Sequence, residues 1–142
     1  MADQTKALAS YIHFYEQMTR DDLARVSAIF TKQARFKDPF NDVYGVERIS
    51  TIFYHMFNTL TAPKFIVEES ILEGDVAYIK WQFTGSLKNK TFKLTGVSRV
   101  VFDQQGLVSE HIDYWDASEQ FYMKLPIIGG LLRLIRKQAA SS

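Results

Sequence analysis

Apolar side chains recur at the three- and four-residue spacing of an amphipathic helix in three segments near the start of the chain. The first segment is 5–18, and the second is a short helix that ends at Phe30. The third and most regular segment is 46–61, which Pro63 is expected to end. The pattern therefore predicts three N-terminal helices.

After the third helix the apolar period changes to two, the repeat of side chains that alternate between the faces of a strand. Four strands are predicted in succession, joined by short polar turns: 65–73, 75–85, 91–103 and 106–116. A shorter strand, 34–40, precedes the third helix, and we expect it at a sheet edge because Pro39 cannot donate to a ladder. Helices and strands are segregated along the chain, so the predicted class is α+β with an antiparallel sheet.

The segment 118–142 has a different character. Gly129 and Gly130 interrupt it, and residues 131–137 predict a short basic amphipathic helix. We expect this helical tail to pack on the domain formed by residues 1–117. A lid over a pocket, a dimer contact and a membrane-surface contact stay open as alternatives, although so short a helix binds a membrane weakly by itself.

Composition fits one domain with a packed core. Of the 142 residues, 46% are hydrophobic and 14% aromatic, and the formal net charge of +1 gives no reason to expect nucleic acid as a partner. The chain has no cysteine, which excludes disulfides and cysteine-based zinc sites and fits a cytoplasmic protein. No apolar run reaches the roughly 18 residues that span a bilayer.

Ionisable side chains gather on the last predicted strand. Alternation from Leu107 places His111, Asp113 and Trp115 on one face, a mixture that suits an apolar pocket wall with a few aimed polar groups. The same alternation sets Asp38 between two phenylalanines, where burial should raise the pKa of its carboxyl. Together these groups can act as a general acid–base set. A structural role also fits, in which Asp38 closes a turn and His111 pairs with Asp113.

The order of predicted elements resembles the cone-shaped nuclear transport factor 2-like fold, a superfamily that includes ketosteroid isomerases and SnoaL-like polyketide cyclases. The resemblance covers residues 5 to about 117, and its most specific part is Phe36-Lys37-Asp38-Pro39. In ketosteroid isomerases the acid before this proline is the general base, so the resemblance assigns that role to Asp38. The isomerases' two oxyanion donors correspond here to Phe14 and Ser98, so neither donor is retained. The resemblance also implies a curved sheet and a homodimer joined through its open face.

We therefore expect a small-molecule pocket protein, with cofactor-free acid–base catalysis of isomerase, cyclase or hydratase type on a small hydrophobic carbonyl compound. Asp38 would be the base, with His111 and Asp113 as an acid or orienting pair. The expected ligand-binding residues are aromatic or carry a hydroxyl group: Tyr15, Phe36, Phe40, Phe53, Phe57, Trp81, Ser98 and Trp115. A non-catalytic module that binds an apolar ligand or a protein is the alternative. No metal site is expected, since no second histidine lies near His111.

Overall fold

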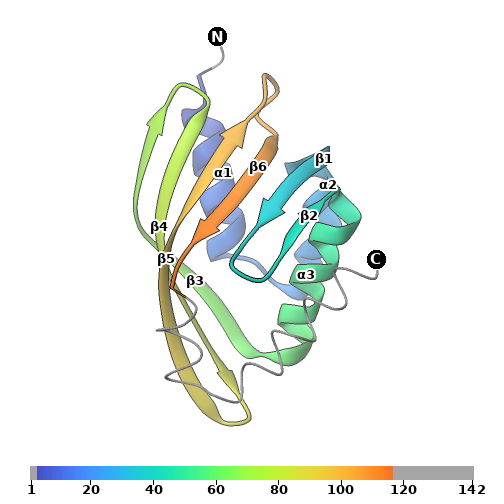
Figure 1. Ribbon diagram of the computed structural model, residues 1–142, viewed down its shortest axis with the longest axis vertical. Helices are drawn as coiled ribbons and strands as arrows, with labels where there is room; N and C mark the ends of the chain where they lie inside the picture. The colour runs from blue at the N-terminus through green and yellow to red at the C-terminus, as the bar shows by residue number, and fades with distance from the viewer. Residues whose placement is uncertain (1–2, 117–142) are drawn as a thin grey trace.

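In the computed structural model, which describes residues 3–116, helices pack against one side of a curved six-stranded sheet (Figure 1). The elements follow one another in the order α1 (Thr5–Glu16), the 3-10 helix η1 (Arg20–Arg25), α2 (Val26–Ile29), β1 (Phe30–Lys37), β2 (Asp42–Tyr44), α3 (Val46–Thr59), β3 (Thr61–Glu73), β4 (Val76–Leu87), β5 (Lys90–Phe102) and β6 (Val108–Tyr114). The predicted helical tail over 118–142 lies outside the described residues. Within the described part, no helix combines the length and the apolar character that a membrane span requires.

The first and third predicted helices are confirmed, and the second is not a regular α-helix. On α1, Leu8, Tyr11 and Phe14 are buried, and on α3 the buried residues are Ile49 and Phe53, so each helix turns one apolar stripe to the core. Between them the chain forms η1 and then the single turn α2. The predicted second helix also extended too far, because Phe30 already belongs to β1.

The sheet is mixed, which corrects the prediction of an antiparallel sheet. Its strand order is β2-β1-β6-β5-β4-β3, and β1 runs parallel to β6 while the other neighbours are antiparallel. Strand β1 is therefore internal, between β2 and β6, and not at an edge. Pro39 lies after the last residue of β1, so its missing N–H removes no hydrogen bond from the ladder.

Two boundaries near the strands also differ from the predictions. The three-residue strand β2 was missed, because a segment of that length carries too little alternation to detect. Pro63 does not end α3, which stops at Thr59; it lies inside β3, the edge strand opposite β2. An edge strand tolerates proline because one side of its backbone needs no ladder partner.

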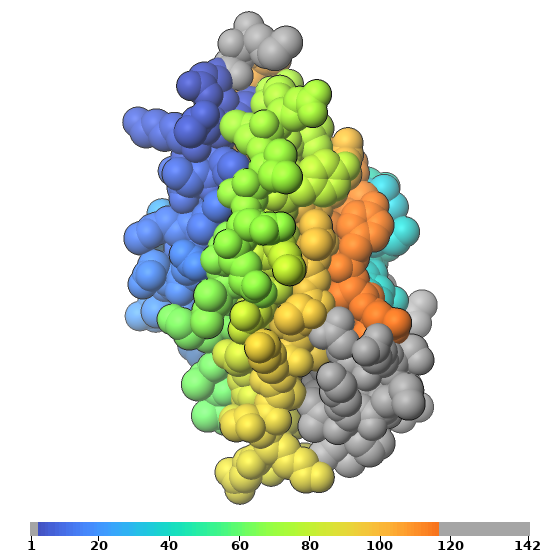
Figure 2. Space-filling model, turned by 90° about the vertical axis from the view of Figure 1, so that its left-hand side faces the viewer, coloured from blue at the N-terminus to red at the C-terminus, as the bar shows by residue number. Residues whose placement is uncertain are grey.

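Side chains of the long strands β4 and β5 alternate between an inner and an outer face, as the predicted period of two requires. The buried side chains of the inner face are Ala77, Ile79, Trp81, Phe83 and Leu87 on β4, and Phe92, Leu94, Ser98, Val100 and Phe102 on β5. The outer face, seen in Figure 2 over β3 to β6, is not wholly polar. It exposes Ile71, Tyr78 and Tyr114, with 67%, 47% and 56% of their surface accessible.

Strand β6 departs from simple alternation at one residue. Val101 pairs with Glu110 and Phe102 with Val108, so Ser109 is an extra residue in β6. After this bulge His111 faces inward as predicted. Before it, the alternation of inward and outward side chains is displaced by one residue from the predicted one. Val108 is therefore buried, although alternation from Leu107 had placed it on the outer face.

Candidate active site

A cavity of about 150 Å³ lies between the inner face of the sheet, α1 and α3. Its walls are mostly aromatic and aliphatic side chains, and all the predicted site residues except Phe57 line it: Tyr15, Phe36, Asp38, Phe40, Phe53, Trp81, Ser98, His111, Asp113 and Trp115. An apolar cavity of this size binds a ligand such as benzene. The geometry therefore suits a small, largely hydrophobic molecule.

Phe57 is absent from the cavity wall because of its position on α3. Consecutive helical residues are about 100° apart, so Phe57 points well away from Met56, which does line the cavity. The Phe57 side chain is half-buried against the core, and its carbonyl oxygen accepts a hydrogen bond from Arg20 at 3.2 Å. Its predicted ligand-binding role therefore has no geometric support.

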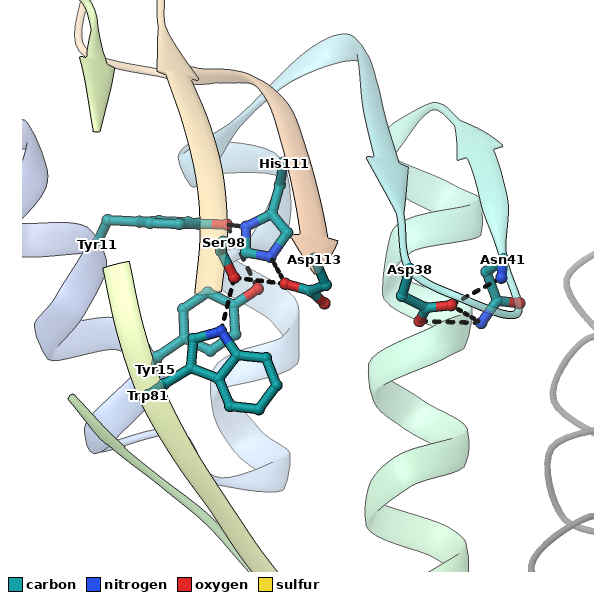
Figure 3. Close-up of polar contacts among 8 residues, drawn as sticks. All are labelled: Tyr11, Tyr15, Asp38, Asn41, Trp81, Ser98, His111 and Asp113. Carbon is teal, nitrogen blue, oxygen red and sulfur yellow. Dashed lines mark hydrogen bonds and ion pairs between the residues drawn. The ribbon is translucent and has the colours of Figure 1, made fainter. Parts of the chain in front are cut away.

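His111 is fixed on both faces and at both ring nitrogens. Only 3% of its surface is exposed, and the imidazole stacks between Phe36, at 4.7 Å between ring centroids, and Tyr15, at 5.7 Å. Nδ1 lies 2.8 Å from the Tyr11 hydroxyl, and Nε2 lies 2.7 Å from Oδ1 of Asp113 (Figure 3). His111 is thus positioned to pass a proton or a charge between these partners and has no free nitrogen to contact a ligand.

The hydrogen-bond partners of His111 define where its protons sit. An ionised carboxylate only accepts, so Nε2 carries a proton toward Asp113. When the ring is neutral, Nδ1 accepts from the Tyr11 hydroxyl; when it is an imidazolium, Nδ1 donates to that oxygen. Tyr11 in turn lies 3.4 Å from the Tyr15 hydroxyl, which lines the cavity. Burial raises the pKa of both phenols well above the usual value, so both stay protonated.

Asp113 is held from a second direction by β4 and β5. The indole Nε1–H of Trp81 donates to Ser98 Oγ at 2.8 Å, and the Ser98 hydroxyl donates to Asp113 Oδ1. Oδ1 therefore accepts two hydrogen bonds, from Ser98 and His111. Oδ2 has no hydrogen-bond partner among the described residues, and the Asp113 side chain keeps 16% of its surface exposed.

Asp38 occupies the turn between β1 and β2, apart from the His111–Asp113 pair (Figure 3). Its Oδ1 accepts the backbone N–H groups of Phe40 at 2.8 Å and Asn41 at 2.7 Å, and the Asn41 amide donates to both carboxylate oxygens. Asp followed by Pro favours such a turn. Burial, and then the nearby charge of Asp113, raise the pKa of Asp38 to about 6 against the opposing effect of these hydrogen bonds.

Two residues of the site were missed at the level of sequence. The predicted site residues included neither Tyr11, on the first helix, nor Asn41, in the turn after Asp38. The i, i+4 spacing of Tyr11 and Tyr15 was a usable signal, because residues four apart share a helix face. Nothing in the sequence pointed to Asn41 as a partner of Asp38. Among residues 3–116 no group of three His, Asp or Glu side chains is arranged to hold a metal ion.

Comparison with known proteins identifies relatives at the level of the family and of the fold. A family model described as a SnoaL-like domain matches residues 11–111. Among curated proteins there is no match. The family match covers most of the chain and includes the second half of α1, the Asp38 turn and His111.

Solved structures with the same fold carry several activities. An LEH-like epoxide hydrolase of M. tuberculosis is 14% identical, with 93% of this chain and 94% of that chain covered and a TM-score of 0.69. A steroid delta-isomerase of Pseudomonas aeruginosa is 15% identical, covers 100% and 97%, and has a TM-score of 0.67. A Jannaschia protein assigned as a SnoaL-like polyketide cyclase is 16% identical, covers 81% and 88%, and has a TM-score of 0.68. At these identities the likeness shows the nuclear transport factor 2-like fold alone.

Proposed function

The chain belongs to the SnoaL-like domain family, and from the geometry of its cavity we propose that it is a cofactor-free acid–base enzyme. Its substrate is a small hydrophobic carbonyl compound, and its reaction moves a proton on the carbon next to the carbonyl group. One observation carries the proposal: a carboxyl of raised pKa, Asp38, shares an apolar cavity with a hydrogen-bonded chain that ends at a phenol, Tyr15.

Asp38 is the base in this mechanism. A pKa of about 6 leaves the carboxyl mostly ionised at neutral pH, yet close enough to neutrality to hold and return a proton. Oδ1 is occupied by the backbone of the turn, so Oδ2, which accepts only the Asn41 amide at 3.2 Å, takes the proton from the substrate. General base catalysis of this kind contributes about 10²–10⁴-fold to the rate.

The Tyr15 hydroxyl supports the oxygen on which negative charge develops. With His111 as an imidazolium, Nδ1 donates to Tyr11, Tyr11 donates to Tyr15, and Tyr15 donates to the substrate oxygen. Asp113 stabilises the charge on the ring through Nε2. A donor aimed at an oxyanion in an apolar site contributes about 10²–10³-fold, which supplies the function of the oxyanion donors that Phe14 and Ser98 cannot provide.

The test uses a β,γ-unsaturated cyclohexenone, a one-ring ketone that becomes a conjugated enone when a proton moves from the α to the γ carbon. The conjugated product absorbs in the ultraviolet, and in heavy water it acquires deuterium. We expect turnover by the wild-type chain and none by Asp38→Asn. Binding of the ketone with no exchange of its α-protons would overturn the proposal and favour the alternative, a module that binds an apolar ligand without chemistry.

The exposed outer face of the sheet supports a second part of the proposal, a homodimer joined through that face. Ile71, Tyr78 and Tyr114 present apolar surface there in the single chain. Sedimentation of the full chain measures its mass directly. We expect twice the monomer mass, and a lower apparent mass for Tyr114→Lys; a monomeric wild type would contradict the dimer without affecting the catalytic proposal.

A further inference from the structure

The Asp113 carboxylate is oriented by two donors, the Ser98 hydroxyl and the imidazole of His111. Indole nitrogen is only a donor, so Trp81 forces Ser98 Oγ to accept there and to aim its own proton at Asp113. Gly96 makes this possible, because a Cβ at that position would lie 2.5 Å from Cζ2 of Trp81. The indole therefore occupies the space above Gly96 on β5, with its N–H directed at Ser98.

The two oxygens of Asp113 therefore have different surroundings. Oδ1 takes the hydroxyl of Ser98 and the Nε2–H of His111, and both donors hold it in place. Oδ2 has no described partner, although Asp113 lines the apolar cavity. The Asp113 side chain is 16% exposed, so solvent can reach it while the cavity is empty, but an apolar ligand that filled the cavity would leave Oδ2 without a donor, which is costly. Of the two oxygens of Asp113, Oδ2 is therefore the one that remains available to accept a hydrogen bond from a ligand in the cavity.

We propose that Asp113 Oδ2 accepts a hydrogen bond from a hydroxyl group of the substrate, which makes the substrate a hydroxylated carbonyl compound. The proposal rests on the proposed function in one respect, since it takes the cavity to be the substrate site. In that site Asp38 and Tyr15 contact the carbonyl end of the substrate, and Asp113 binds its hydroxyl group. A ketone without the hydroxyl fills the cavity but leaves Oδ2 unpaired, so the site discriminates against it.

Equilibrium binding to the full-length protein tests this selection without requiring turnover. The probes are cyclohexanone and the three cyclohexanones hydroxylated at the second, third or fourth ring carbon, each titrated by calorimetry. The three isomers place the hydroxyl at different distances from the carbonyl. We expect at least one hydroxylated isomer to bind about 10- to 10²-fold more tightly than cyclohexanone, the usual range for a hydrogen bond to a charged group.

Asp113→Asn is a nearly isosteric change at the atom in question. The amide oxygen can keep the hydrogen bonds from Ser98 and His111, and Nδ2 then replaces the accepting Oδ2 by a donor. The ligand hydroxyl can still accept from Nδ2, but it loses its hydrogen bond to a charged acceptor. We therefore expect this variant to weaken the preference for the hydroxyl and to bind the matching cyclohexanedione, in which a second carbonyl replaces the hydroxyl, more tightly than the wild type does. Asp42→Asn is the matched control: Asp42 is exposed, pairs with Arg35 at 2.9 Å and does not line the cavity, so the preference should remain.

Two results would overturn the inference. One is wild-type protein that binds cyclohexanone as tightly as all three hydroxylated isomers, a result that needs no variant to fold. The other is a folded Asp113→Asn protein whose hydroxyl preference is as large as that of the wild type and which binds the cyclohexanedione no more tightly. The proposed function fails on a different measurement, the absence of cyclohexenone turnover by the wild type, so the two failures are distinguishable.

Discussion

Replacing Asp38 by asparagine should stabilise the folded protein at neutral pH while it removes the proposed base. The pKa of this carboxyl rises from 3.8 to about 6 in the fold, so the ionised form is less favourable in the folded state than in the unfolded chain. Asparagine keeps an oxygen for the N–H groups of Phe40 and Asn41. The buried Oδ1 of Asn41 has no hydrogen-bond partner, and after rotation of its amide it can accept from the new Nδ2.

The magnitude follows from the pKa shift. Roughly two pKa units correspond to about 3 kcal/mol, which is the largest stabilisation that removal of the charge can give. The folded carboxyl binds a proton more tightly than the unfolded one, so the wild type gains stability as pH falls through about 6 and the whole effect is present below 3.8. Between about pH 8 and about pH 5 the difference between variant and wild type should shrink by about 1.5 kcal/mol.

Urea unfolding at both pH values measures this difference directly. Comparing the two proteins at each pH cancels the titration of the histidines that they share. Asp42→Asn is the control on the same hairpin: Asp42 is exposed and its pKa is lowered by the hydrogen bonds from Arg35, so this change should not stabilise the fold. An Asp38→Asn protein that is less stable than wild type at about pH 8, or a difference that does not vary with pH, refutes the reasoning.

Four further changes test the rest of the site. Asp113→Asn removes a charge that raises the pKa of Asp38, so this pKa should fall below about 6 when it is followed through the side-chain amide signal of Asn41; an unchanged titration would contradict the coupling. Tyr15→Phe should lower kcat for the cyclohexenone by about 10²–10³-fold with little change in KM, whereas equal activity would remove Tyr15 from the mechanism. Tyr11→Phe leaves His111 Nδ1 without its phenol and should lower the free energy of unfolding by about 1–3 kcal/mol in urea. Gly96→Ala should cost about 1–3 kcal/mol and alter Trp81 fluorescence, because its Cβ needs the space of the indole; normal stability and emission would mean that the ring is free to move.

The apolar pattern predicted the long helices and strands well, because each buried position favours an apolar residue and the spacing of these residues follows the period of the element. The period of two predicted the strand 75–85, and the structure buries one alternating row of it, Ala77, Ile79, Trp81 and Phe83; the apolar repeat over 46–61 likewise predicted α3, which buries Ile49 and Phe53. The fold class followed from the order of these elements, and the family resemblance supplied the curvature. The mixed sheet did not follow, since the parallel pairing of β1 with β6 joins segments far apart in the chain.

A local irregularity in a strand, the bulge in β6, accounts for another difference between the predicted and the observed structure. The extra residue Ser109 shifts the phase of β6 and reverses the predicted environment of Val108. His111 and Asp113 follow the bulge, so their predicted side was correct even though alternation from Leu107 was not. The two readings of Asp38, closing a turn and facing a cavity, both hold, because one oxygen binds the turn while the carboxyl lines the pocket.

The hydrogen-bonded chain itself depends on the spacing of two tyrosines on α1. Residues four apart on a helix lie on one face and are separated by a rise of about 6 Å. Tyr11 and Tyr15 can therefore both reach the same imidazole, that of His111 on β6. Tyr11 bonds to His111 across 100 positions of sequence, and Tyr15 stacks on the same ring. One residue inserted between Tyr11 and Tyr15 would rotate Tyr15 by about 100° around the helix and break the chain, so the site requires both tyrosines on the face of α1 that meets His111.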